Sequence, residues 1–333
     1  MFLIIDGSSL LTSSYYGNLP KEVLMAKTEE EKKANYNKIL HSKNGKYTNA
    51  IYTMSKSLVK MLKEQKPDYI AVVFDKSRNT FRRFMYPGYK AQRGETPEPL
   101  KEQFVAMEDI LKTSGFMVLY SDNYEADDYA GSITDKFAGK EPIRLLTKDH
   151  DYMQLVNDSL DVKLWLLLNS KESLQKAIAA CGDSQESLNK PYRSYELGEK
   201  EIENLEGILP YQIPEIKGIC GDASDNIPGI RGVSDKTAVP LLKKYRTLDT
   251  IYQEIHNRDE KELAAEWKSL GIKRNPIKQF KEGKEIGRLS VNLATIRRNI
   301  PVPESIEDYA VTKLDMGVFA RKLADFDITS IKI

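Results

Sequence analysis

The sequence has few cysteines and no long apolar run. Its 333 residues include two cysteines, Cys181 and Cys220, whose spacing fits neither a metal site nor a disulfide framework, so we expect both to be small buried residues in a reducing compartment. No stretch approaches the roughly 18 apolar residues of a membrane span, and the opening MFLIIDGSS carries no basic leader. These absences argue against secreted and membrane-spanning classes and predict a cytoplasmic protein.

A strong net charge is also missing. Lys and Arg number 50 against 49 Asp and Glu, so any surface for nucleic acid must be local. There is no GxxxxGK phosphate loop, and no local signature of Ser-His-Asp or Cys-His catalysis. With 41% hydrophobic and 30% charged residues the chain has the balance of an ordinary globular protein, and its length suggests about two domains.

What the chain does have is a series of acids that almost all follow apolar runs. The runs FLII, IAVVF, MVLYS and IRLLT indicate short buried strands, and helix-compatible segments separate them. This alternation predicts an α/β fold with a mostly parallel central sheet flanked by helices. Residues that follow parallel strands meet at one edge of the sheet. The set comprises Asp6, Asp75, Glu125, Asp127, Asp128, Asp149, Asp151, Asp222 and Asp225.

So many carboxylates in one crevice need a compensating charge, because like charges at close range disfavour ionisation. Hard divalent cations with oxygen ligands, Mg²⁺ or Mn²⁺, supply it. Each acidic motif alone has a plainer explanation: YEADD could be acids at a helix start, and TKDHD and GDASDN could be turns. Their joint occurrence at successive strand ends is what predicts a metal site.

A basic and aromatic segment, residues 76–93, follows Asp75 directly. It reads KSRNTFRRFMYPGYKAQR, with cations for phosphates, rings for unstacked bases and no acid, although a solvated basic loop is the alternative. Lys90 or Arg82 could stabilise charge on a phosphate being cleaved. The other nucleic-acid contacts expected here are Arg78, Phe81, Arg83, Tyr86, Tyr89 and Arg93.

A second nucleic-acid signal is GIRGVSDKTA, residues 229–238. Two glycines permit a tight turn between helices, so that backbone N–H groups at the start of the second helix can face a phosphate, with a serine as N-cap. A purely structural turn would explain this motif equally well on its own. The DNA contacts expected from it are Gly229, Gly232, Ser234, Lys236 and Thr237.

The organisation predicted along the chain has three parts. Residues 1–198 form an α/β core with a basic arch at about 76–100, residues 199–300 form a helical DNA-binding region, and residues 301–333 pack back on the core. Two segments interrupt the core pattern. Residues 21–46 indicate a solvated helix and loop, and residues 169–198 an insertion or lid.

An ordered series of segments resembles the 5′ nuclease family: the 5′→3′ exonuclease domain of bacterial DNA polymerase I, its stand-alone relatives, phage 5′ exonucleases and flap endonucleases. The resemblance implies a PIN-like 5′ nuclease fold with a helical arch and a helix-three-turn-helix unit that grips duplex DNA. It runs from residue 1 to about residue 300. The segments are FLIIDGSSLL, VVFDKSRNTFRRFMYPGYKAQR, NYEADDYAGSI, LLTKDHDYMQLV, GICGDASDNIPGIRGVSDKTA and LSVNLATIRRNIPV.

The resemblance also implies roles for residues. Lys90 would assist phosphodiester cleavage and Tyr89 would contact a base, while Ser234 with Val233 and Ile230 would hold a monovalent cation, commonly K⁺. Asp128 would be a further acid between two metal sites. The first site would use Asp6, Asp75, Glu125 and Asp127, and the second Asp149, Asp151, Asp222 and Asp225.

The function expected is that of a two-metal 5′→3′ exonuclease and 5′-flap endonuclease in DNA replication and repair, removing RNA primers or flaps. Its partners would be DNA with a 5′ end or 5′ flap, or an RNA–DNA hybrid, and it would act as a monomer without a membrane. No polymerase portion follows residue 333, which favours a stand-alone enzyme. The alternatives are a catalytically inactive structure-specific DNA-binding protein and a PIN-type ribonuclease.

Overall fold

A six-stranded sheet forms the centre of the protein. The computed structural model describes residues 1–168, 170–182, 189–191 and 193–333. The strand order is β3-β2-β1-β4-β5-β6, and every pairing is parallel except that of β6 with β5. The four predicted strands are confirmed. The strands are β1 (Phe2–Asp6), β2 (Tyr69–Val73), β3 (Met117–Leu119), β4 (Ile143–Thr147), β5 (Val162–Leu167) and β6 (Ser194–Leu197).

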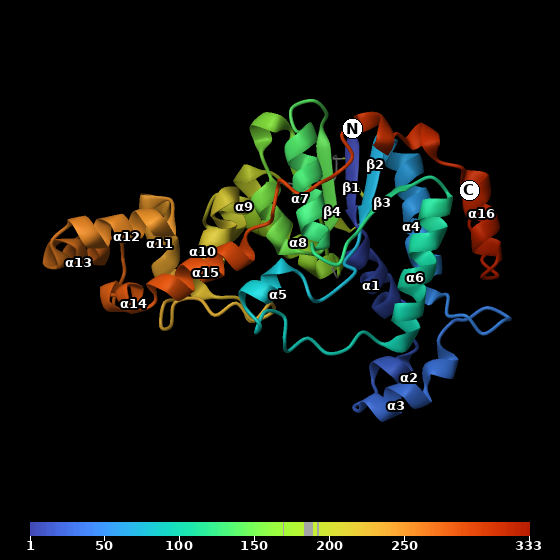
Figure 1. Cartoon of the computed structure of the whole chain (residues 1–333), viewed down its shortest axis with the longest axis horizontal. Helices are drawn as coiled ribbons and strands as arrows, with labels where there is room; N and C mark the ends of the chain where they lie inside the picture. The colour runs from blue at the N-terminus through green and yellow to red at the C-terminus, as the bar shows by residue number, and fades with distance from the viewer. Residues whose placement is uncertain (169, 183–188, 192) are drawn as a thin grey trace.

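Helices cover both faces of this sheet (Figure 1). Successive side chains of β1 alternate between two apolar clusters: Phe2 and Ile4 belong to one, and Leu3 and Ile5 to the other. The strand is apolar throughout because both of its faces are buried. The second cluster takes most of its helical residues from α1 (Gly7–Gly17), α4 (Asn49–Gln65), α6 (Glu98–Thr113) and α16 (Met316–Ala324). The first takes most of them from α7 (Ala126–Phe137), η2 (His150–Leu155) and the helices that follow β6.

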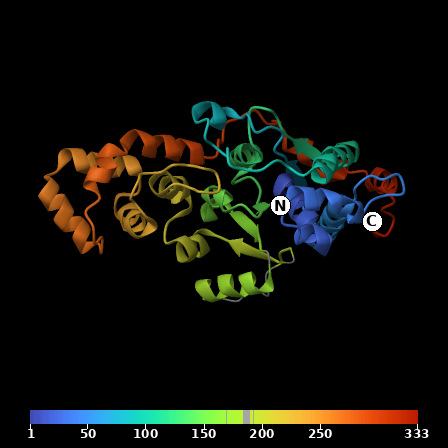
Figure 2. The ribbon, with the colours of Figure 1, turned by 90° about the horizontal axis from the view of Figure 1, so that it is seen from below.

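Residues 199–294 form a helical unit that extends to one end of the molecule, away from α16 (Figures 1 and 2). Its core is continuous with the α7 side of the sheet. Helices α10 and α15 approach so closely that a Cβ on Gly218 would lie 2.1 Å from Val291 Cγ2. The helices are α9 (Glu199–Glu206), α10 (Ile213–Cys220), α11 (Asp235–Tyr245), α12 (Leu248–Asn257), α13 (Glu260–Ser269), α14 (Ile277–Glu282) and α15 (Lys284–Ala294).

The two interrupting segments differ in structure. Residues 21–46 contain α2 (Lys21–Leu24) and α3 (Glu29–Ala34), and α3 has no buried residue, as expected of a solvated helix. Residues 169–198 contain α8 (Lys171–Cys181), which packs against α9, and the edge strand β6. The lid interpretation of that segment falls partly on residues 169, 183–188 and 192, which lie outside the described residues.

The C-terminal residues close the amino end of the sheet. The Val311 N–H donates to the Asp68 carbonyl at 2.9 Å. The Tyr309 ring lies 5.0 Å from that of Phe2, the first residue of β1. With the amino end covered in this way, the carboxyl ends of the strands remain for a site. None of the described helices combines the length and apolar character needed to cross a membrane.

Candidate active site

The acids that follow β1 and β2 lie together at the carboxyl edge of the sheet. Asp6 ends β1 and caps α1, accepting hydrogen bonds from the Ser9 N–H at 2.8 Å and the Thr147 hydroxyl at 2.7 Å. Asp75 accepts from the Ala126 N–H, in the first turn of α7, at 3.0 Å. Burial and the neighbouring charge of Asp75 raise the pKa of Asp6 to about 7. The end of β1 therefore holds a carboxyl group that a cation would help to ionise.

The start of α7 adds three more acids. Glu125 is its N-cap, and Asp128 completes a capping box with it. Burial raises the pKa of Asp127 well above its ordinary value, with Asp128 and Glu125 adding to the effect, and its Oδ1 is buried without a hydrogen-bond partner. The hydroxyl of the buried Tyr152 also lacks a partner within the described residues. Burial, and then the charges of Asp6 and Asp127, raise the pKa of that tyrosine. Asp127 Oδ1 and the Tyr152 hydroxyl are thus two buried polar atoms without a hydrogen bond at this group of acids.

Arg82 is bound on all sides instead of facing a substrate. Its guanidinium forms a two-point pair with Asp128, both bonds at 2.8 Å, and donates to the carbonyls of Leu293 at 2.9 Å and Thr295 at 3.1 Å. The side chain is 1% exposed. A buried guanidinium in this arrangement ties helix α5 (Phe81–Met85) to α7 and to the end of α15. The expected direct action of Arg82 on a phosphate does not match this geometry.

Lys90 points into the group of acids. Its Nζ lies 2.5 Å from Glu125 Oε2 and 3.7 Å from Asp225 Oδ2. Burial opposes the charge of this lysine, but Glu125 and Asp225 raise its pKa well above the ordinary value, so it stays protonated. Its backbone φ of +52° is left-handed, which costs a residue other than glycine about 1–2 kcal/mol. Local strain of this kind is typical of functional positions.

Tyr89 lies inside the site and not on its surface. It is 3% exposed, and its hydroxyl donates to Glu125 at 3.2 Å and to Asp225 at 3.1 Å. Asp225, expected in the second group, thus lies next to Glu125 of the first. The buried ring is not available to stack on a base in this conformation. The nearby Phe84, in contrast, is 80% exposed.

Two of the later acids, Asp151 and Asp222, pair with a lysine that sequence reasoning missed. Lys217 on α10 pairs with Asp151, and its Nζ lies 2.6 Å from Asp222 Oδ2. Burial and Asp149 raise the pKa of Asp151 to about 6, although Lys217 opposes them. In Asp222 the hydrogen bonds from Lys217 and Ser224 outweigh burial and hold the pKa at about 2. The only available signal was the place of Lys217, five residues before Asp222.

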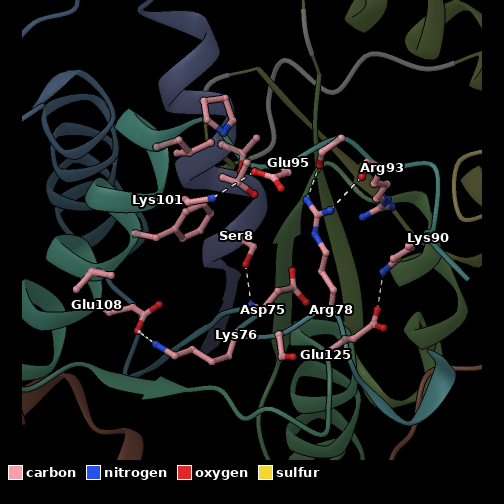
Figure 3. Close-up of a pocket in the computed structure, with 18 of the residues that line it drawn as sticks. Ser8, Asp75, Lys76, Arg78, Lys90, Arg93, Glu95, Lys101, Glu108 and Glu125 are labelled. Atoms are coloured by element: carbon pink, nitrogen blue, oxygen red, sulfur yellow. Dashed lines mark hydrogen bonds and ion pairs between the residues drawn. The ribbon is translucent and has the colours of Figure 1, made fainter. Parts of the chain in front are cut away.

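Two adjoining cavities open onto the acids. The larger, about 670 Å³, is lined by Asp75, Glu125, Lys90, the loop at 93–97 and the start of α6 (Figure 3). The smaller, about 600 Å³, takes Asp6, Asp149, Asp151, Asp222 and Lys217. Ser8, Thr12, Asp75 and Arg93 line both. Across the described ranges, no three Asp, Glu, His or Cys side chains already stand together as metal ligands.

The arch and its expected DNA contacts are only partly helical. Within residues 76–100, α5 and the first residues of α6 are helical, and turns fill much of the remainder. Phe81, Arg83 and Tyr86 are half-buried, and Arg78 is exposed. Arg93 pairs with Asp225, so its guanidinium already has an anionic partner in this conformation.

The glycine turn between α10 and α11 has the predicted form. Gly229 and Gly232 have φ of +62° and +82°, and a Cβ on Gly229 would lie 2.2 Å from the Gly221 nitrogen. Ser234 occupies the N-cap of α11, but its hydroxyl makes no capping hydrogen bond. Lys236 lies exposed in the first turn of α11, and Thr237 follows it there. The turn thus presents the start of α11 together with a cation.

Family models cover most of the chain. Residues 1–182 match the 5′-3′ exonuclease N-terminal resolvase-like domain, and residues 208–317 match the 5′-3′ exonuclease C-terminal SAM fold. The chain belongs to the 5′-3′ exonuclease family. The resemblance inferred from the sequence motifs is confirmed. Both models describe a 5′-3′ exonuclease.

Relatives within the family include stand-alone exonucleases and parts of polymerases. The 5′-3′ exonuclease of Aquifex aeolicus is 28% identical over 98% of this chain and 92% of its own length. DNA polymerase I of Bacillus caldotenax is 31% identical over 92% of this chain, which spans 29% of that polymerase. The solved structure of bacteriophage T5 flap endonuclease, in a complex with DNA and metal ions, has a TM-score of 0.58 and 17% identity over 97% of both chains. This structural likeness shows the shared fold.

Proposed function

We propose that the protein hydrolyses DNA phosphodiester bonds at a 5′ end or a 5′ flap with two divalent metal ions. The observation that carries this proposal is the group of acids at the carboxyl edge of the sheet. Asp6 and Asp127 have raised pKa values, and Asp127 Oδ1 accepts no hydrogen bond within the described part of the chain. These residues fit Mg²⁺ or Mn²⁺, because both ions prefer carboxylate oxygens.

The acids divide between two candidate ion positions as the family resemblance implies. When bound, the two ions would supply a water of lowered pKa and neutralise charge on the phosphate. Asp128 serves Arg82 instead, since both of its oxygens accept from that guanidinium. The first position would use Asp6, Asp75, Glu125 and Asp127, and the second Asp149, Asp151, Asp222 and Asp225.

The cationic residues of the arch have separate tasks in this proposal. Lys90 stays protonated beside Glu125 and would donate to the phosphate as its negative charge grows. Arg93 would exchange Asp225 for a phosphate oxygen. Arg82 is a positioning residue, because its donors are engaged with Asp128 and with backbone carbonyls. Tyr89 would hold Glu125 and Asp225 in register through its hydroxyl.

The duplex part of the substrate would rest on the turn at residues 229–237. Its glycines bring backbone N–H groups to the start of α11, where Lys236 adds a cation for a phosphate. A K⁺ ion held by the carbonyls of Ile230 and Val233 and the hydroxyl of Ser234 would strengthen this contact. The hydroxyl of Ser234 makes no capping hydrogen bond, so it would lose none by binding the ion.

The biological role that fits this activity is removal of flaps or RNA primers in replication and repair, by a monomer acting on DNA or an RNA–DNA hybrid. A catalytically inactive binding protein is disfavoured because all nine acids and Lys90 are present. A PIN-type ribonuclease remains the second candidate, and substrate choice distinguishes the two activities.

The test offers end-labelled 5′-flap, nicked, single-stranded and RNA-primed duplexes with Mg²⁺ or Mn²⁺ to the unmutated protein and to Asp75→Ala. We expect metal-dependent cleavage near the 5′ end or flap junction, and none by the variant. If the unmutated protein binds these duplexes but cleaves none of them, the binding-module alternative replaces the nuclease. Cleavage confined to RNA strands would favour the ribonuclease.

A further inference from the structure

Arg78 extends across the larger cavity to residues 88–94, which form the far limb of the arch. It lies three residues after Asp75, in the loop that leaves β2. Its Nη1 donates to the Arg93 carbonyl at 3.0 Å, and its Nη2 donates to the Gly94 carbonyl at 2.5 Å (Figure 3). A guanidinium presents its donors in a rigid fork, and here two nitrogens of the fork hold two successive peptide carbonyls.

The limb that Arg78 holds is tied on its other side to the turn at residues 222–227. The Lys90 N–H donates to the Asp225 carbonyl at 2.8 Å, and the Gln92 side chain donates to the Ala223 carbonyl at 2.7 Å. Asn226 donates to the Gly88 carbonyl at 2.6 Å. These bonds fix residues 88–92 to the helical unit. Arg78 connects the next two residues of the limb to the end of β2.

This tie matters because the limb contains a strained residue. Lys90 has a left-handed backbone, and such a conformation persists only where the surrounding structure holds it. Arg78 grips the chain three residues after Lys90, where the turn leaves the acids. Loss of the two hydrogen bonds from Arg78 would allow residues 93 and 94 to move, and Lys90 and Arg93 would then shift from their positions.

The sequence suggested a different role for Arg78, a direct contact with phosphate. Its contacts argue against this role in the free protein, because its two terminal nitrogens donate to loop carbonyls. Within the residues that the structure describes, no carboxylate forms an ion pair with it. What determines its position is therefore the shape of the loop and not an opposite charge.

We propose that Arg78 is a positioning residue that latches the arch loop, residues 86–97, to the end of β2 and so holds Lys90 over the acids. Its consequence for catalysis rests on the proposed nuclease function. The latch itself is a property of the protein without substrate, which allows the two ideas to be tested apart.

The first measurement is hydrogen exchange of the Mg²⁺-loaded protein without DNA, read on peptides covering residues 88–97. We expect Arg78→Ala and Arg78→Lys both to accelerate exchange there by about tenfold, because alanine has no donor and the single nitrogen of lysine lacks the rigid two-nitrogen fork that spans both carbonyls. Lys101→Ala is the matched control. That lysine lines the same cavity and makes only a loose 3.8 Å pair with Glu95, so its loss should leave exchange unchanged.

The second measurement is single-turnover cleavage of a 5′-flap duplex, with duplex affinity determined separately. The latch predicts that both Arg78 variants cleave about tenfold more slowly at unchanged duplex affinity. Wild-type exchange in Arg78→Ala would overturn the latch, and so would wild-type exchange and cleavage in Arg78→Lys, since charge alone would then suffice. If neither the unmutated protein nor any variant cleaves the 5′-flap duplex, but exchange rises in the Arg78 variants as expected, the latch is supported and the nuclease proposal fails.

Discussion

The acids of the core and the acids of the helical unit are held in place by different means. Asp6 and Asp75 are fixed by the parallel pairing of β1 with β2 and by hydrogen bonds to the first turns of α1 and α7. Asp222 instead exchanges two backbone hydrogen bonds with Ile227, in a turn whose approach depends on how α10 packs against α15. The first arrangement follows from local structure, whereas the second requires a tertiary contact. Damage to that contact should therefore displace the acids of the turn more than Asp6 and Asp75.

The largest expected effect is on the cleavage rate, when one acid in each half of the site is replaced by its neutral amide. Asp127→Asn should lower metal-dependent cleavage by about a thousandfold or more, because its Oδ1 accepts no hydrogen bond from any described residue and is therefore free to bind a metal ion. Asp222→Asn should lower it by about ten- to a hundredfold, because Lys217 still pairs with Asp151. Single-turnover rates at several Mg²⁺ concentrations would measure both losses. Equal losses would mean that the two halves act as one unit.

The next effect concerns pH and the stability of the metal-free protein. The pKa of Asp6 is about 7 in the folded state against 3.8 as its ordinary value. Its contribution to stability is therefore complete below about pH 4 and is lost as pH rises through 7, a loss of about 2–4 kcal/mol. Asp6→Asn can keep the cap on α1 and removes the titration, so it should be the more stable protein at pH 8.

Urea unfolding in EDTA at pH 5 and pH 8 would measure this difference, and added Mg²⁺ should restore the stability that the unmutated protein loses at pH 8. If the free energies of unfolding of the two proteins change equally between these pH values, Asp6 is not the group responsible.

The smallest effect tests the docking of the helical unit. Gly218→Ala would place a methyl group against Val291, including its backbone nitrogen at 3.1 Å, so α10 and α15 must separate slightly. We expect a loss of about 1–3 kcal/mol in the free energy of unfolding. Cleavage should slow while Mg²⁺-dependent stabilisation through Asp6 survives. Gly17→Ala is the control, because nothing lies within 4 Å of the added carbon.

Much of this architecture was predictable because the strands β1 and β2 are short apolar runs that lead directly into an acid. The strand pattern identified β1 to β4, and the rule that parallel strands present their carboxyl ends together located Asp6 and Asp75. The family motifs then assigned the acids of α7 and of the turn after α10. Local pattern sufficed wherever backbone geometry decides where a side chain points.

Local pattern failed where a long side chain chooses among distant partners. Arg82 and Tyr89 were expected to face a substrate, yet the first pairs with Asp128 and the second bridges Glu125 and Asp225. Lys217 was overlooked because its partner Asp151 lies 66 residues away in the chain. Sequence composition indicates that cations are present, but only the packed fold determines which acid each one meets.

The packing of Tyr309 against Phe2 has a consequence for the state of the chain during its synthesis. The aromatic ring that covers the beginning of the first strand is translated more than 300 residues after that strand. At about 5–20 residues per second, the nascent chain carries this uncovered edge for tens of seconds. A messenger truncated before codon 309 should therefore yield a polypeptide that retains every acid of the site and yet depends on chaperones to stay unaggregated.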